Sequence, residues 1–396
     1  MPDTFCILPW VHIYANADGS VLPCCIGDYR MHMGNVRENN IEEILNGSKY
    51  KTMRSKMLRG EKCQECNACY QAESLGDTSF RQHMNEQFAK YIPDALSIDQ
   101  DGTLNKINIK YLDIRWSNIC NFKCRSCSST YSSTWAQEDN LQGHKKPIHI
   151  FAGGKDNNSL YNQFKPYLNG IEKFYFAGGE PLLTDKHYEI LDDLISIGKT
   201  DVTLEYNTNL SNLRYKKTPV TDYWKHFDKV KIGASLDSFA NRAEYIREGT
   251  DWPIIVKNIK EIKEKCSNVE MHISSVVSVF NISTIPEFLD YMYDNNLFDQ
   301  APLFYNIINP DFYSLNIIPD DIKISIEEKL SSSKLKYNTQ TQNQINKVIA
   351  QLTQSKYNIN LHKQFVKTTL HYDNIRNRNF ANTFPEIKEL LDENIL

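Results

Sequence analysis

The sequence predicts an α/β protein: a partial (β/α)6, TIM-like barrel between a small cysteine-rich N-terminal domain and a C-terminal helical region. Short apolar runs alternate with helical stretches in the middle of the chain, and this alternation is typical of a parallel sheet. The unusual polar and cysteine-rich segments directly follow the apolar runs, at the strand ends where such folds place their functional sites. Six units suit a partial barrel better than a complete eightfold one, and the spacing also fits a doubly wound sheet.

Composition narrows the class of protein. The 396 residues are 41% hydrophobic and 24% charged, with a net charge of −4, which is typical of a globular chain rather than a disordered one. This charge provides no general attraction to nucleic acid or to an anionic membrane. No apolar run reaches the roughly 18–20 residues that span a bilayer, and the N-terminus lacks the basic segment of a signal peptide. We therefore expect a cytoplasmic protein with no membrane partner and no clear nucleic-acid partner.

Residues 1–100 predict a small, loop-rich domain. Alternating apolar residues flank Asp18-Gly19, a strong turn pair, so residues 11–24 are expected to form a hairpin. Residues 42–59 have apolar positions at helical spacing, interrupted at Gly47. Elements of this size bury little surface, so the domain needs another source of stability.

We expect residues 105–318 to form the barrel and residues 319–396 to form helices packed on it. Helical candidates include 186–197 and 253–265, and Ser331–Ser333 suggests a turn within the C-terminal region. The expected strands are the apolar runs 111–116, 173–176, 202–206, 230–235, 269–279 and 303–308.

The cysteines are clustered rather than dispersed. Nine of the ten lie in two groups, one within the first seventy residues and one at Cys120, Cys124 and Cys127, and Cys266 alone is solitary. Short gaps in a chain without an export signal indicate metal ligation or redox chemistry in a reducing compartment. A structural zinc site normally uses four protein ligands. The second group offers three thiolates with no close fourth ligand, and three thiolates on an iron–sulfur cubane leave one iron open.

Every motif falls at the end of an expected strand. The three-cysteine loop follows the first run, Gly178-Gly179-Glu180-Pro181 follows the second, Asn207–Asn209 follows the third, and Ser235–Asp237 ends the fourth. Because the carboxyl ends of parallel strands share one edge, these segments should lie near one another.

On these residues the chain resembles the radical SAM superfamily. The spacing Cys120-x3-Cys124-x2-Cys127 and the Gly178-Gly179-Glu180 motif match the family over about residues 107–310. The resemblance implies that the three cysteines hold a [4Fe–4S] cluster whose open iron binds S-adenosyl-L-methionine. Reductive cleavage of this cofactor to a 5′-deoxyadenosyl radical, which takes a hydrogen atom from a substrate, is the implied reaction. An electron donor such as flavodoxin or ferredoxin is implied as a partner.

The same resemblance suggests which residues contact S-adenosylmethionine. Gly178, Gly179 and Glu180 correspond to the segment near the methionine amine, and glycine permits a close backbone approach. Ser235 and Arg247 match positions at the methionine end, where the guanidinium fork suits a carboxylate. Asn209 is expected near the ribose. No catalytic acid, base or hydrogen donor stands out in the sequence.

The N-terminal region resembles the twitch/SPASM auxiliary-cluster domains. Cys6, then Gly19-x4-Cys24, then Cys66-x2-Cys69 follow the order of their cysteines, which implies a second iron–sulfur cluster, expected to be a [4Fe–4S] cluster. In many relatives this domain follows the barrel, whereas here it precedes it. Spacing leaves open whether Cys25 or Cys63 replaces one of the four ligands.

Two alternatives accompany this interpretation. The cysteines could hold structural zinc in a non-catalytic binding module on an α/β scaffold, because Cys-x2-Cys pairs bind zinc equally well. For an enzyme, the small auxiliary domain favours a small-molecule substrate such as a sugar, followed by a peptide or protein.

Overall fold

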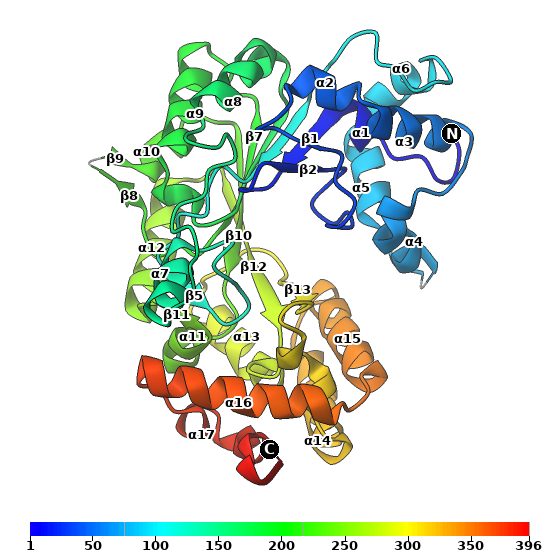
Figure 1. Cartoon of the computed structure of the whole chain (residues 1–396). Helices are drawn as coiled ribbons and strands as arrows, with labels where there is room; N and C mark the ends of the chain where they lie inside the picture. The colour runs from blue at the N-terminus through cyan, green and yellow to red at the C-terminus, as the bar shows by residue number, and fades with distance from the viewer. Residues whose placement is uncertain (75, 217, 396) are drawn as a thin grey trace. The chain divides into compact units, whose positions relative to one another are not determined.

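The computed structural model describes residues 1–74, 76–216 and 218–395, which form two compact units (Figure 1). The first unit comprises Met1–Cys120, Pro147–Tyr206 and Lys225–Val230, and the second comprises Asn121–Lys146, Asn207–Trp224 and Lys231 onward. Both units combine helices with a largely parallel sheet, which confirms the α/β class. All six apolar runs predicted as strands are strands.

The sheet of the first unit has the strand order β7-β6-β4-β1-β2-β3. Strands β4, β6 and β7 are parallel to one another, and β1 pairs in parallel with β4, with His12 opposite Tyr111. The predicted hairpin is present as β1 and β2, with Tyr14 opposite Leu22. The strands are β1 His12–Ala15, β2 Ser20–Leu22, β3 Gly34–Asn35, β4 Tyr111–Ile114, β6 Lys173–Phe176 and β7 Thr203–Thr208.

The N-terminal hairpin therefore extends the sheet instead of standing alone. Its stability comes in part from backbone hydrogen bonds to β4 and from the buried aromatic residues around it, a contribution that local sequence patterns do not reveal. The helical segment at 42–59 is divided into two helices at Asn46 and Gly47, as the glycine suggests. The helices of this unit are α1 Leu8–Val11, α2 Ile41–Leu45, α3 Ser48–Leu58, α4 Asn67–Ser74, α5 Phe80–Gln87, α6 Ile92–Leu96, α8 Asn158–Phe164 and α9 Asp185–Ser196.

The two faces of this sheet differ in polarity, because successive strand side chains point to opposite sides. On one face Phe174 stacks on Phe176, which packs against His187 of α9, and this face is apolar. On the other face the Lys173 ammonium lies 2.6 Å from a Glu205 carboxylate oxygen and 4.7 Å from the centre of the Tyr111 ring. This second face of the sheet, called the inner face, is therefore charged and rich in tyrosine.

The second unit contains strands in the order β13-β12-β10, with β12 and β13 parallel, and two short antiparallel pairs. Its strands are β5 Lys123–Cys124, β8 Arg214–Tyr215, β9 Thr218–Pro219, β10 Lys229–Ser235, β11 Arg247–Glu248, β12 Val269–Val277 and β13 Leu303–Asn306. Its helices are α7 Ser133–Leu141, α10 Val220–Trp224, α11 Ala240–Ile246, α12 Trp252–Lys265, α13 Ile285–Asp294, α14 Asp320–Ser333, α15 Thr339–Gln354, α16 Ile359–Arg376 and α17 Phe380–Thr383.

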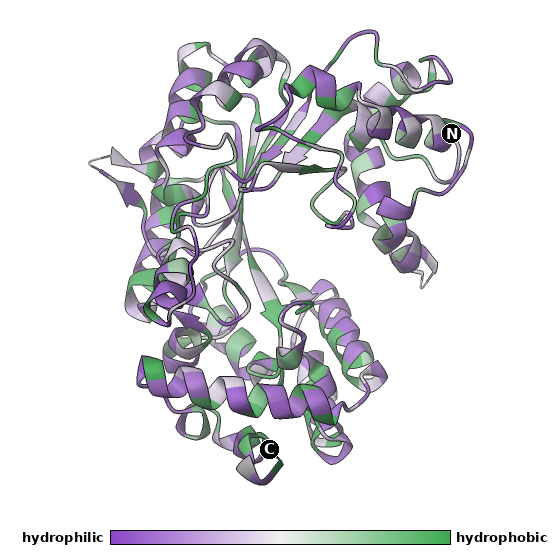
Figure 2. Cartoon of the chain, in the orientation of Figure 1, coloured by the Kyte–Doolittle hydropathy of each residue, from purple (hydrophilic) through white to green (hydrophobic). Residues whose placement is uncertain are grey.

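The C-terminal region is helical, and each of its three longest helices, α14, α15 and α16, buries one side. Figure 2 shows hydrophilic and hydrophobic colour along α16, and Phe365 of this helix contacts Phe280 and Phe380 in a buried aromatic cluster. The turn predicted at Ser331–Ser333 is wrong, because these serines form the last turn of α14. The Ser332 and Ser333 hydroxyls donate to carbonyls three residues earlier, which lets serine remain helical.

Along residues 1–74, 76–216 and 218–395, no helix combines the length and the apolar character needed to cross a membrane.

Candidate functional site

The three-cysteine loop follows β4. Cys120 is the last residue of a segment of the first unit, and Cys124 and Cys127 lie in the second unit. Cys124 belongs to β5, which pairs with β11 so that Cys124 lies opposite Arg247, and the Cys127 amide donates to the Cys124 carbonyl over 3.0 Å. Burial raises the pKa of both thiols, that of Cys127 to about 12. Metal binding at these thiols would release their protons.

Arg247 lies between an acid and a sulfur atom. Its Nε is 2.8 Å from Asp237 Oδ2, its Nη2 is 3.1 Å from Asp237 Oδ1, and its Nη1 donates towards the Cys124 sulfur at 3.7 Å. Burial opposes the charge of the guanidinium, but the Asp237 carboxylate and Cys124 raise its pKa above the usual value. In this structure the Arg247 guanidinium, which the sequence assigns to a cofactor carboxylate, makes two hydrogen bonds to Asp237. Its Nη1 is directed at Cys124, a predicted cluster ligand.

Asp237 is a residue whose role sequence reasoning missed. It follows a strand, and that position suggests an ordinary turn former. In the structure Asp237 is 2% exposed and also accepts the Val276 amide at 2.8 Å, so it joins the ends of β10 and β12 to Arg247. The position of Asp237 at a strand end was the one sequence feature that could have indicated this role.

The glycine motif folds onto the residues that precede Cys120. Gly178 and Gly179 have φ angles of +84° and +53°, in the left-handed region that favours glycine. A Cβ on Gly179 would lie 2.4 Å from the Ile119 carbonyl oxygen, and the Glu180 amide donates to that same oxygen over 2.7 Å. The Glu180 side chain accepts the Leu182 amide, as a helix cap does. Because Gly179 has no Cβ, the backbone of the glycine motif lies close to the backbone that leads into the cysteine loop.

Asn209 and Ser235 belong to the second unit, and each lies at the end of a strand. Asn209 follows β7, donates to the Asn121 side chain at 3.1 Å and accepts the Ser211 amide at 2.9 Å. Asn121 directly follows Cys120, so Asn209 is connected to the cysteine loop. Ser235 is the last residue of β10 and is partly exposed. Contact of these two residues with a cofactor remains a prediction.

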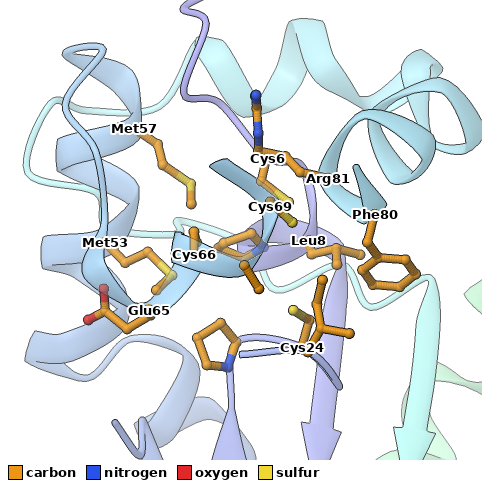
Figure 3. A pocket seen from close by; sticks show the side chains of 14 residues that line it. Cys6, Leu8, Cys24, Met53, Met57, Glu65, Cys66, Cys69, Phe80 and Arg81 are labelled. Atoms are coloured by element: carbon orange, nitrogen blue, oxygen red, sulfur yellow. The ribbon is translucent and has the colours of Figure 1, made fainter. Parts of the chain in front are cut away.

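The four N-terminal cysteines border one cavity. Cys6, Cys24, Cys66 and Cys69 come from three separate segments of the first unit and line one small cavity (Figure 3). Met53, Met57, Leu8 and Phe80 make the rest of its lining largely apolar, with Glu65 and Arg81 as charged members. Burial, followed by the neighbouring thiols, raises the pKa of Cys66, and burial raises that of Cys6 to about 12.

The two remaining N-terminal cysteines do not line this cavity. Cys63 is fully buried and its sulfur donates to the Met53 carbonyl at 3.7 Å. Cys25 lies close enough to Asp113 and Arg115 on the inner face of the sheet for their charges to affect its pKa. The structure therefore places the four cysteines that the sequence selects on one cavity. Cys25 lies apart from it, whereas Cys63 is outside the lining but close enough to Cys6 and Cys66 to affect their pKa.

The donor set fits an iron–sulfur cluster, because soft thiolates in a largely apolar lining suit such clusters. The arrangement is a thiol-lined cavity rather than a tight cage. Among the residues that the structure describes, no three His, Cys, Asp or Glu side chains converge closely enough to ligate one metal ion.

Comparison with known proteins agrees with this chemistry. Residues 6–70 match the SPASM iron–sulfur cluster-binding domain, and residues 114–292 match the radical SAM superfamily. The fold and the two cysteine sites thus define an α/β iron–sulfur protein. Residues 114–292 form a radical SAM domain and residues 6–70 form an N-terminal SPASM domain, and these two domains imply [4Fe–4S] clusters and S-adenosylmethionine as cofactors.

Curated relatives resemble only part of the chain. A GTP 3′,8-cyclase from Campylobacter curvus (strain 525.92) is 29% identical over 142 residues, which are 35% of this chain and 38% of the relative. The S-adenosylmethionine-dependent nucleotide dehydratase RSAD2 of Siniperca chuatsi is 24% identical over 196 residues, 47% of this chain and 48% of the relative. The chain spans less than half the length of these relatives.

Solved structures resemble the chain at low identity. Native anSMEcpe with bound AdoMet is 20% identical, covers 66% of each chain and has a TM-score of 0.41. Streptococcus suis SuiB bound to S-adenosylmethionine is 15% identical, with a TM-score of 0.37, and covers 87% of this chain and 65% of its own.

Proposed function

We propose that this chain is an enzyme that reductively cleaves S-adenosylmethionine at a [4Fe–4S] cluster held by Cys120, Cys124 and Cys127. When bound, this cofactor pair supplies a 5′-deoxyadenosyl radical that abstracts hydrogen from a substrate. One observation carries the proposal: the Gly178–Glu180 segment folds onto the Ile119 carbonyl, directly before the first cysteine. Two motifs about fifty residues apart in the sequence thus meet at the loop where the family places both groups.

Arg247 and Asp237 provide charge at this loop. The Asp237 carboxylate fixes the guanidinium by two hydrogen bonds, and the remaining Nη1 donates towards the Cys124 sulfur. A cation at this distance compensates a ligating thiolate and makes acceptance of an electron easier, since hydrogen bonds to sulfur raise cluster potentials. Gly178, Gly179, Glu180, Asn209, Ser235 and Arg247 remain the proposed cofactor contacts.

The N-terminal cavity is the proposed site of the auxiliary [4Fe–4S] cluster, with Cys6, Cys24, Cys66 and Cys69 as its ligands. The support is that these four line one largely apolar cavity, whereas Cys25 and Cys63 do not. The apolar lining limits the access of water, which is one of the factors that set the reduction potential of a cluster.

We favour a small polar substrate, a sugar or a nucleotide, over a peptide. The Arg115 guanidinium on the inner face of the first unit lies 4.8 Å from the Tyr175 ring centre and 5.3 Å from that of Tyr14, beside Asp113 at 3.2 Å. Such a face suits hydroxyl and phosphate groups, because arginine presents several donors in a fixed plane. Two curated relatives have names that specify nucleotide substrates. We place the reaction in the cytoplasm, with a flavodoxin or ferredoxin as electron donor.

The test is anaerobic reconstitution with iron and sulfide, followed by addition of S-adenosylmethionine and a strong reductant. We expect 5′-deoxyadenosine from the wild type and from Cys266→Ala, which alters a buried cysteine outside the loop, and none from Cys124→Ala. A wild type that contains zinc and no iron, or that fails to cleave the cofactor, would rule the proposal out. Candidate sugars, nucleotides and peptides are then compared by deuterium transfer from labelled substrate into 5′-deoxyadenosine.

A further inference from the structure

Arg125, one of the two residues between the second and third cysteines, is bound by helix α16. Arg125 lies between Cys124 and Cys127, is 2% exposed, and its Nη2 is 2.8 Å from Oδ1 of Asp373 in the last turn of α16. Its guanidinium carbon also lies 4.2 Å from the centre of the Tyr245 ring, so the cation is held by both charge and stacking. These contacts restrict the Arg125 side chain to few conformations.

Asp373 is itself fixed by two further donors. The Tyr245 hydroxyl donates to Asp373 Oδ1 at 2.6 Å, and the Phe380 amide donates to its Oδ2 at 2.6 Å. Because a buried carboxylate with several donors is held in one geometry, Asp373 transmits the position of α16 to Arg125. All of these groups belong to the second unit.

Arg376, in the same turn of α16 as Asp373, holds the backbone before Cys124. The Arg376 Nε lies 3.0 Å and 3.1 Å from the two oxygens of Glu138 in α7, and its Nη1 donates to the Lys123 carbonyl at 3.2 Å. Its guanidinium carbon is 4.5 Å from the centre of the Trp135 ring, and that indole donates to the Cys124 carbonyl at 2.8 Å. The backbone carbonyls of both residues of β5, Lys123 and Cys124, therefore accept side-chain hydrogen bonds.

A third arginine acts on the partner strand. Arg378, just beyond α16, makes two hydrogen bonds to Glu248, of 2.9 Å and 3.1 Å. Glu248 lies opposite Lys123 in the β5–β11 ladder that contains Cys124. Three ion pairs, Arg125–Asp373, Arg376–Glu138 and Arg378–Glu248, thus connect the end of α16 to the second half of the cysteine loop.

We propose that the last turn of α16 is a positioning element for Cys124 and Cys127, with Asp373 and Arg376 as its positioning residues. This inference rests on the proposed function of the cysteine loop, and it extends the binding machinery beyond residues 114–292, where the family match ends. Asp373 also balances the charge of Arg125 beside two ligands. Its loss leaves an uncompensated cation that stabilises the reduced, more negative cluster and raises its reduction potential.

The test compares Asp373→Asn with Glu386→Gln. Glu386 is a matched control, because it also joins the C-terminal region to another part of the second unit, helix α11, through two hydrogen bonds to Arg242 of 2.6 Å and 2.9 Å, and its bonds are not to the loop. In metal-free protein we measure iodoacetamide labelling of each cysteine by mass spectrometry. We expect Cys124 and Cys127 to react about tenfold faster in Asp373→Asn, since loss of a charged hydrogen bond weakens a local contact by roughly that factor or more.

In reconstituted protein we measure the reduction potential of each cluster by EPR-monitored titration. We expect the three-cysteine cluster to shift upwards in Asp373→Asn and to return towards the wild-type value in Asp373→Glu, which keeps the charge. The auxiliary cluster serves as the internal control and should not shift. If Asp373→Asn fails to fold, Arg376→Gln is measured in its place with the same expected labelling.

Equal labelling and equal potentials in Asp373→Asn, Glu386→Gln and wild type would overturn the inference. A wild type that binds no cluster at the loop would instead contradict the proposed function. The labelling experiment separates these two failures, because it needs no cluster.

Discussion

Replacing Gly179 with alanine tests the contact between the glycine motif and the cysteine loop. The new Cβ would lie 2.4 Å from the Ile119 carbonyl oxygen and 2.9 Å from the Asn118 carbonyl carbon, both backbone atoms. Real Cβ atoms do not approach this closely, so the two segments must separate. Separation weakens the hydrogen bond from the Glu180 amide to the same carbonyl.

The magnitude follows from three contributions. Alanine at a φ of +53° costs about 1 kcal/mol, the steric overlap costs about 1–3 kcal/mol, and the weakened hydrogen bond costs up to about 1 kcal/mol. Gly198 has a φ of +69°, and no atom lies within 4 Å of the position that an alanine methyl group would take there, so Gly198→Ala carries the first cost alone. We expect Gly179→Ala to be destabilised by about 3 kcal/mol and Gly198→Ala by about 1 kcal/mol.

The assay is urea unfolding of the metal-free variants, followed by iron analysis after reconstitution. Gly179→Ala should also retain less iron at the three-cysteine loop, because Ile119 directly precedes Cys120, whereas Gly198→Ala should retain the wild-type amount. If the two variants differ from each other by less than about 0.5 kcal/mol and bind equal iron, the steric argument is wrong.

Three other predictions concern the first unit. Cys69→Ala should lower the iron of reconstituted protein from about eight atoms per chain to about four, and Cys63→Ala should not lower it; iron analysis that gives the opposite order would reject the ligand assignment. Burial lowers the pKa of His187 to about 3, so the folded state stays neutral while the unfolded state binds a proton below about pH 6.5. Stability is therefore lost as the pH falls, by about 2 kcal/mol at pH 5, and urea unfolding of His187→Phe should lack that loss. Arg54 donates to three buried backbone carbonyls, so Arg54→Met should cost about 3 kcal/mol, and a loss below about 1 kcal/mol by urea unfolding would contradict this.

Local patterns were sufficient for the strands. Most of the predicted apolar runs are strands with at least one buried face, and β4 is buried on both faces, so hydrophobicity marks them. Strand β13 differs, because its residues are half-buried or exposed. The serines at the end of α14 show the limit of such patterns. Their turn preference is weak, and packing of the neighbouring Leu330, which is buried, keeps the segment helical.

The roles of charged residues depended on contacts that the sequence does not display. Aspartate after a strand is typical of a turn, yet the Asp237 carboxylate holds Arg247 beside Cys124, a predicted cluster ligand. Arg125 and Asp373 are 248 positions apart and nevertheless form a buried ion pair. No local periodicity reports such a pairing, because only the fold brings the two residues together.

The sequence by itself determined the kinds of chemistry available: two groups of cysteines, a glycine motif, and the alternation of strands and helices. These follow from residue type and short spacing, which physical chemistry links to thiolate ligation, close backbone approach and a parallel sheet. Only the tertiary structure decided that four of six N-terminal cysteines line one cavity, and that α16 holds the second half of the cysteine loop. The reason is physical: ligand selection and buried ion pairing depend on distance and burial, and both arise from packing between segments that are remote in the chain.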